Sequence, residues 1–150
     1  MTERFERFTV LINKISRSVK RIKNQEMSDH GLRATHVSCL YYLSSPEPVT
    51  ATDLCERCEE DKATISRAID YLECNGYLTR DAKRPKRYKS PLVLTEKGWR
   101  VAEKISAKIN AVLDEISVEL TEEQRIAFYK SLALISDRLD VICRRFDENK

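Results

Sequence analysis

The stretch DKATISRAIDYLECNGYLTR, residues 61–80, holds a helix start, an apolar helix face, a helix end and the beginning of a strand. Asp61 is a favourable N-cap residue, and Asn75-Gly76 is typical of a helix end. Four apolar residues at helical spacing predict the face that packs inward: Ile65, Ala68, Ile69 and Leu72. The stretch therefore predicts a helix between Asp61 and Asn75, followed by a strand over 77–80.

The segments on either side of this stretch complete a small lobe. Thr50-Ala51-Thr52-Asp53 is a capping-box pattern that predicts a short helix ending near Cys58. An apolar helix over 32–43 precedes it, and a second strand is predicted over 92–94. The order helix, short helix, turn, helix, strand, basic hairpin, strand is that of a winged helix-turn-helix.

Long amphipathic helices are predicted at both ends of the chain. Apolar residues alternate at three and four positions from Phe5 to Ile22 and again from Phe128 to Phe146. A fifth helix begins after Thr95, and a capping box at Thr121 starts the sixth. Two chains can cover these stripes by forming a homodimer, whereas the alternative is a monomeric bundle. We expect one mainly α domain over 1–150 with a small β-hairpin, a DNA-binding lobe over 32–98 and dimerisation helices over 3–27 and 99–147.

Composition narrows the class of protein. The 150 residues are 41% hydrophobic and 34% charged, with three Gly and four Pro, which favours one helix-rich domain. The N-terminal residues lack the apolar core of a signal peptide and no run is long enough to span a membrane, so we expect a cytoplasmic protein with no membrane partner. The five cysteines then indicate reduced thiols. No glycine-rich phosphate loop or Ser, His and acid trio has a suggestive context, so we expect no enzyme and no cofactor.

Positive charge is concentrated in RDAKRPKRYKS, residues 80–90. The whole chain has a net charge of +3, but this stretch alone carries +5, so the remainder carries −2. A local basic patch suits the phosphates of double-stranded DNA, although it could also be a solvated loop or a surface that docks an acidic protein. The candidate DNA contacts are four residues on the outer face of the 61–75 helix and six on the hairpin: Lys62, Thr64, Ser66 and Arg67, and Arg80, Lys83, Arg84, Lys86, Arg87 and Lys89.

The motifs of the central lobe resemble those of the MarR family of bacterial transcription regulators. They are Leu32-x-x-x-His36-x-x-Cys39-Leu40-x-x-Leu43, Thr50-x-x-Asp53-Leu54, Thr64-x-Ser66-Arg67-x-x-x-x-Leu72-x-x-Asn75-Gly76-Tyr77-Leu78-x-Arg80 and Leu92-x-Leu94-Thr95-x-x-Gly98. The resemblance implies a homodimer formed by the terminal helices, with two winged lobes that bind a pseudo-palindromic operator. Many members are repressors that are released by small ligands or by cysteine oxidation.

The hairpin departs from the family pattern. Members usually carry Asp-x-Arg eight residues before the Leu-Thr pair, where the Arg enters the minor groove. Here the same positions read Lys86-Arg87-Tyr88. Either Arg84 or Arg87 takes over this role, or the hairpin tip binds phosphate without reading the width of the groove.

Two histidines flank the entry to the 32–43 helix, near the place where members of the family bind aromatic anions. His36 stands where the family often has Gln. We consider His30 and His36 either as effector contacts or as ordinary hydrogen-bonded side chains at the helix junction.

The cysteines allow a redox alternative. Cys74 is predicted to be exposed beside the helix end, and Cys143 lies on the last helix next to the expected dimer interface; either could act as a thiol switch. Cys55-x-x-Cys58 resembles half of a metal site, but zinc requires more ligands nearby, so we expect buried thiols and no metal there.

Overall fold

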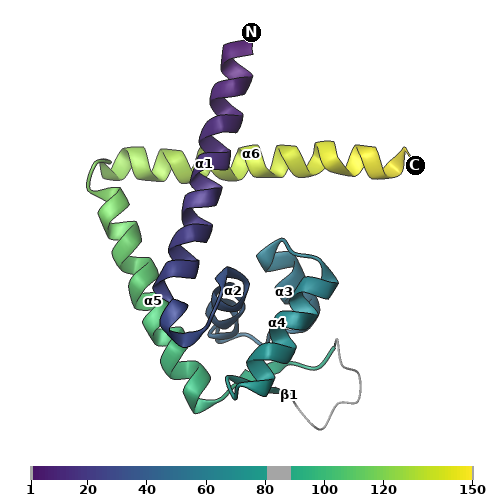
Figure 1. Ribbon diagram of the computed structural model, residues 1–150. Helices are drawn as coiled ribbons and strands as arrows, with labels where there is room; N and C mark the ends of the chain where they lie inside the picture. The colour runs from purple at the N-terminus through teal and green to yellow at the C-terminus, as the bar shows by residue number, and fades with distance from the viewer. Residues whose placement is uncertain (1, 81–88, 150) are drawn as a thin grey trace. The chain divides into compact units, whose positions relative to one another are not determined.

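The computed structural model describes residues 2–80 and 89–149. In chain order its elements are α1 (Thr2–Glu26), the 3-10 helix η1 (Ser28–His30), α2 (Ala34–Leu43), α3 (Ala51–Cys58), α4 (Lys62–Cys74), β1 (Leu78–Arg80), β2 (Leu92–Leu94), α5 (Glu96–Ser117) and α6 (Glu122–Glu148) (Figure 1). The chain forms two compact units, 1–108 and 109–150. The predicted order of six helices and one hairpin is confirmed.

Local capping bonds explain where the helices begin. The Thr50 hydroxyl accepts a bond of 3.2 Å from the Asp53 N–H, and the Asp53 carboxylate accepts one of 2.8 Å from the Thr50 N–H. Thr121 and Gln124 form the same reciprocal pair at 3.2 and 2.9 Å. Each box satisfies two backbone donors that the first turn of a helix leaves unpaired. The two capping boxes read from the sequence are therefore confirmed.

The entry to α2 differs from the prediction. The helix begins at Ala34 rather than near Leu32, because residues 28–31 form a 3-10 turn that ends at Gly31 with φ +69°. That left-handed conformation favours glycine. The side-chain oxygen of Asn24 then accepts a bond of 2.6 Å from the Ala34 N–H, so the end of α1 caps the start of α2.

One apolar core lies inside the first unit. It is formed by α2, α3, α4, the hairpin and the first turns of α5, and its fully buried side chains include Leu32, Leu40, Leu54, Ile65, Ile69, Leu72, Leu78 and Ile105. The four residues predicted to face inward from α4 are all buried. The core therefore fixes which face of α4 remains outside.

The hairpin is joined tightly to α5. β1 and β2 pair antiparallel, with Leu78 opposite Leu94 and Arg80 opposite Leu92. A Cβ atom at Gly98 would lie 2.0 Å from the Tyr77 carbonyl oxygen, so only glycine permits this approach of α5 to the strand.

Many apolar residues in the stripes of the two terminal helices are exposed. On α1 the exposed members are Phe8, Ile12, Ile15, Val19 and Ile22, and on α6 they are Phe128, Ile135, Leu139, Ile142 and Phe146. Their helical spacing is as the sequence predicts. None of the helices over 2–80 and 89–149 combines the length and apolar character that a membrane span requires.

Candidate nucleic-acid interface

The turn between α3 and α4 sets the start of the candidate recognition helix. Glu59 ends α3 in a left-handed conformation, with φ +54°, and the chain then turns into Asp61. The Asp61 carboxylate accepts a bond of 2.7 Å from the Thr64 N–H, and this bond lowers the pKa of Asp61 below its ordinary value. Asp61 is therefore the N-cap that the sequence predicts.

The outer face of α4 carries the four residues proposed to contact DNA. Lys62 and Arg67 are exposed, whereas Thr64 and Ser66 are half-buried. The Arg67 guanidinium lies 3.4 Å from the Thr64 hydroxyl and donates to it. This contact holds the arginine near the capped end of the helix, where winged helix-turn-helix proteins meet base edges.

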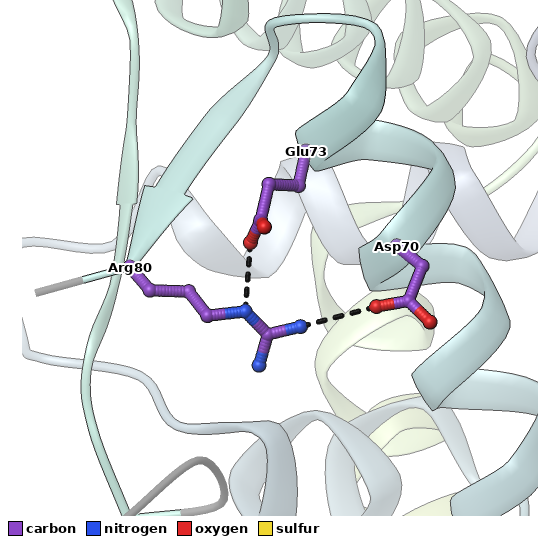
Figure 2. A network of polar contacts seen from close by, with 3 residues as sticks. All are labelled: Asp70, Glu73 and Arg80. Atoms are coloured by element: carbon purple, nitrogen blue, oxygen red, sulfur yellow. Dashed lines mark hydrogen bonds and ion pairs between the residues drawn. The ribbon is translucent and has the colours of Figure 1, made fainter. Parts of the chain in front are cut away.

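Arg80 faces α4 instead of standing alone on the hairpin. Figure 2 shows its guanidinium between two acidic side chains of α4: Nε donates to Glu73 at 2.7 Å and Nη2 to Asp70 at 3.2 Å. Its side chain is only 20% exposed. Sequence reasoning missed both partners, although two acids three residues apart on one helix are a recognisable signal. The geometry makes Arg80 a brace between β1 and the recognition helix, so its proposed contact with DNA stays a prediction.

The rest of the basic hairpin is only partly described. Lys83, Arg84, Lys86 and Arg87 lie outside the described residues. Whether Arg84 or Arg87 enters the minor groove therefore stays a prediction. Lys89, three residues before β2 begins, is exposed.

His36 lies between the start of α2 and the recognition helix. Its Nδ1 accepts a bond of 3.0 Å from the Arg33 N–H, and its ring stacks on Tyr71 with centroids 4.4 Å apart. Burial, with the nearby Arg33 charge, lowers the pKa of His36. The Tyr71 hydroxyl donates to the Gly31 carbonyl at 3.1 Å. His36 is thus already engaged with α4, whereas His30 is exposed on η1.

The cysteines divide into two groups. Cys74 and Cys143 are both exposed, as predicted for Cys74. Cys55 and Cys58 are half-buried, which differs from the prediction of buried thiols, because they lie on the last turn of α3 at the edge of the core. Within residues 2–80 and 89–149, no group of three or more His, Cys, Asp and Glu side chains could hold a metal ion.

Known proteins match both the sequence and the fold. Residues 30–87 match the sequence profile of the MarR family. An HTH-type transcriptional regulator of Bacillus subtilis, YwoH, is 28% identical over 117 residues, which are 78% of this chain and 85% of that protein.

Two solved structures illustrate the likeness in fold. A MarR family regulator from Silicibacter pomeroyi has a TM-score of 0.72 and 26% identity, covering 83% of this chain and 84% of that one. The MepR–DNA complex of S. aureus has a TM-score of 0.77 and 19% identity, covering 88% and 97%. These matches agree with the winged helix-turn-helix geometry, with the capped helix α4 and with the resemblance seen in the motifs.

The profile and the relatives together also settle the class of protein. Members of the matched family regulate transcription and are not enzymes, which confirms the expectation drawn from the sequence. In its sequence over residues 30–87 and in its fold, the chain is similar to the MarR family of transcriptional regulators.

Proposed function

We propose that this regulator binds double-stranded DNA sequence-specifically as a homodimer and acts as a ligand-responsive repressor on a pseudo-palindromic operator. The observation that carries the proposal is the outer face of α4, where Arg67 and Lys62 are exposed beside the capped helix start. Arginine can bridge the O6 and N7 atoms of guanine, and lysine can neutralise a phosphate. The MepR–DNA complex, which shares the fold, supports DNA as the partner.

The exposed stripes of α1 and α6 support the homodimer. Apolar faces of this length are rarely left in water by a stable soluble chain, and a second copy offers matching faces. A two-fold dimer presents two recognition helices about one helical turn of DNA apart, roughly 10 base pairs. The expected operator is therefore a pseudo-palindrome with half-sites at that spacing.

The contact between His36 and Tyr71 supports a response to small ligands. Tyr71 belongs to α4, so a ligand that displaced it from the His36 ring would alter how the recognition helix is held. This displacement lowers the affinity for DNA only if the ligand binds more tightly when Tyr71 is displaced from the His36 ring.

Selection from a random duplex library at near-physiological salt tests this proposal. We expect the full-length protein to enrich a two-fold palindrome. Arg67→Ala should weaken binding to that palindrome by about 1–3 kcal/mol and relax the preference at one position of each half-site. Arg125→Ala, which removes an exposed arginine of α6, is the charge-matched control and should retain the motif.

Two other outcomes would contradict the proposal. Equal loss of affinity for all duplexes in Arg67→Ala would exclude base readout by this residue. Retention of duplexes without an enriched motif, or no retention, would favour a phosphate-binding surface or the alternative module that docks an acidic protein.

A further inference from the structure

The turn that follows α4 presents backbone acceptors to a later element. Gly76, with φ +76°, ends the helix in a left-handed conformation, and the Tyr77 N–H closes the turn with a bond of 2.8 Å to the Leu72 carbonyl. Helices commonly end in this glycine-dependent way. The arrangement satisfies carbonyls of the last helical turn, so the carbonyls of residues 75–77 need partners from elsewhere.

Three successive carbonyls of this turn accept hydrogen bonds from the start of α5. The Thr95 hydroxyl donates to the Gly76 carbonyl at 2.5 Å, and the Thr95 N–H donates to the Tyr77 carbonyl at 3.1 Å. The Lys97 Nζ donates to the Asn75 carbonyl at 2.7 Å. We call these three bonds the carbonyl clamp. They tie the beginning of α5 to the end of α4 although about 20 positions separate the partners in the chain.

Both clamp side chains have a second contact that restricts their position. The Thr95 hydroxyl also accepts a bond of 3.1 Å from the Gly98 N–H, so the same oxygen caps the start of α5. The Lys97 ammonium lies 4.3 Å from the centroid of the Tyr77 ring, within the range of a cation–π contact. Its positive charge also suits the C-terminal end of a helix. Lys97 is exposed, so a count of charges alone would make it a phosphate contact, whereas its partners are those of a structural link.

We propose that Thr95 and Lys97 are positioning residues for DNA recognition, which hold α4 at the angle at which its outer face meets DNA and do not contact DNA themselves. The inference rests on the proposed function of α4. The inner face of α4 is held by apolar packing, which is not directional, whereas the bonds of the carbonyl clamp fix distances and angles. The clamp therefore sets how the end of the helix is oriented.

Loss of the clamp should affect specific and non-specific DNA binding differently. An arginine that bridges two atoms of guanine, the role proposed for Arg67, needs hydrogen bonds within narrow limits of distance and angle. The attraction between a basic side chain and a phosphate falls slowly with distance, so a small movement of α4 leaves it nearly unchanged. We therefore expect the affinity for the operator to fall about tenfold, the effect of about 1.4 kcal/mol, while the affinity for unrelated duplexes stays constant.

Hydrogen exchange of the free full-length protein tests the clamp without DNA. Lys97→Met keeps a long side chain over the Tyr77 ring and removes the donor, and Thr95→Val keeps the shape and removes the hydroxyl. Both variants should speed exchange of the Tyr77 amide, whereas the Leu54 amide in α3 should exchange as in the wild type. Lys97→Arg and Thr95→Ser, which retain the donors, should restore slow exchange at Tyr77. An unchanged rate at Tyr77, or equal acceleration at Tyr77 and Leu54, would overturn the assignment.

DNA binding tests the positioning role, with the palindrome enriched by the wild type and a scrambled duplex of the same composition. Lys97→Met should bind the palindrome about tenfold more weakly and the scrambled duplex equally well, and Lys97→Arg should restore the difference. The slope of log K against log salt concentration should stay constant. Lys104→Met, which removes another exposed lysine of α5, is the charge-matched control and should retain the affinity of the wild type.

Three results would overturn the positioning role. A slope smaller by about 0.9 in Lys97→Met would make the lysine a direct phosphate contact. Equal loss on both duplexes, or no loss on either, would remove its effect on base recognition. If the wild type enriches no duplex, the proposed function fails and the role in DNA recognition fails with it, while hydrogen exchange still decides whether the clamp holds the end of α4.

Discussion

Replacing Arg80 with alanine removes the brace between β1 and α4. Two ion pairs disappear, and Asp70 and Glu73 are left as like charges three positions apart. The two acids are 54% and 43% exposed, so solvent screening limits each pair to roughly 0.2–1 kcal/mol. Loss of the packed aliphatic stem of Arg80 and the new repulsion between the two acids each increase the destabilisation by a few tenths of a kcal/mol. We therefore expect the free energy of unfolding to fall by about 1–2 kcal/mol.

Urea denaturation at 0.1 and 1 M NaCl measures this loss. The difference between the wild type and Arg80→Ala should shrink at high salt, because salt screens the pairs but not the packing of the stem. Arg100→Ala is the matched control: it breaks a pair with Glu96 in which the side chains are 73% and 82% exposed. That variant should lose no more than about 0.5 kcal/mol. Protein concentrations must be equal, because the proposed dimerisation would contribute to apparent stability.

The salt dependence of DNA binding decides whether Arg80 braces the helix or contacts phosphate. If Arg80 is a brace, its loss lowers DNA affinity by moving α4 and leaves the slope of log K against log salt concentration unchanged. A phosphate contact reduces that slope by about 0.9. A reduced slope in Arg80→Ala, combined with stability equal to that of Arg100→Ala, would refute the reasoning from Figure 2.

Three further predictions concern packing, pH and assembly. Gly98→Ala should destabilise the fold by about 3 kcal/mol or more, measured by urea denaturation, because its Cβ would meet a backbone oxygen at 2.0 Å. Because the pKa of His36 is lowered in the folded protein, the unfolded chain binds more protons, and the melting temperature should fall as pH drops through the unfolded pKa of about 6.5. His36→Gln should flatten the dependence of melting temperature on pH. His30→Gln, which leaves His36 intact, should keep that dependence. Leu139→Asp, in the exposed stripe of α6, should convert dimer to monomer in sedimentation velocity, whereas Lys130→Asp on the same helix should not.

Most element boundaries could be predicted from the sequence because they depend on neighbours a few residues apart. Asp61 caps α4 through a bond to a residue three positions away, and the boxes at Thr50 and Thr121 act over the same distance. The apolar stripes of α1 and α6 follow from helical periodicity alone. The entry to α2 was misplaced because its first turn is fixed by Asn24, which lies ten residues earlier.

The contacts that define the site could not be predicted in the same way. Arg80 meets Asp70 across a helix end and a strand, and His36 of α2 stacks on Tyr71 of α4. Such pairs depend on how elements pack, and sequence spacing carries no information about that packing. The charge of Arg80 indicated a DNA contact because charge counting treats every basic side chain as free, whereas the structure shows this one neutralised by two acids.

Helix α4 is held separately at its two ends, and each end offers a route by which a distant event would change the proposed DNA binding. Near its C-terminal end, Tyr71 contacts the entry to α2, while the acids on either side of it hold Arg80 of β1. At its N-terminal end, the Asp61 cap and the turn after Cys58 fix where the helix begins, and so where the exposed Arg67 lies. The middle of the helix contributes mainly apolar side chains to the core. A ligand beside His36 would therefore act through the C-terminal end.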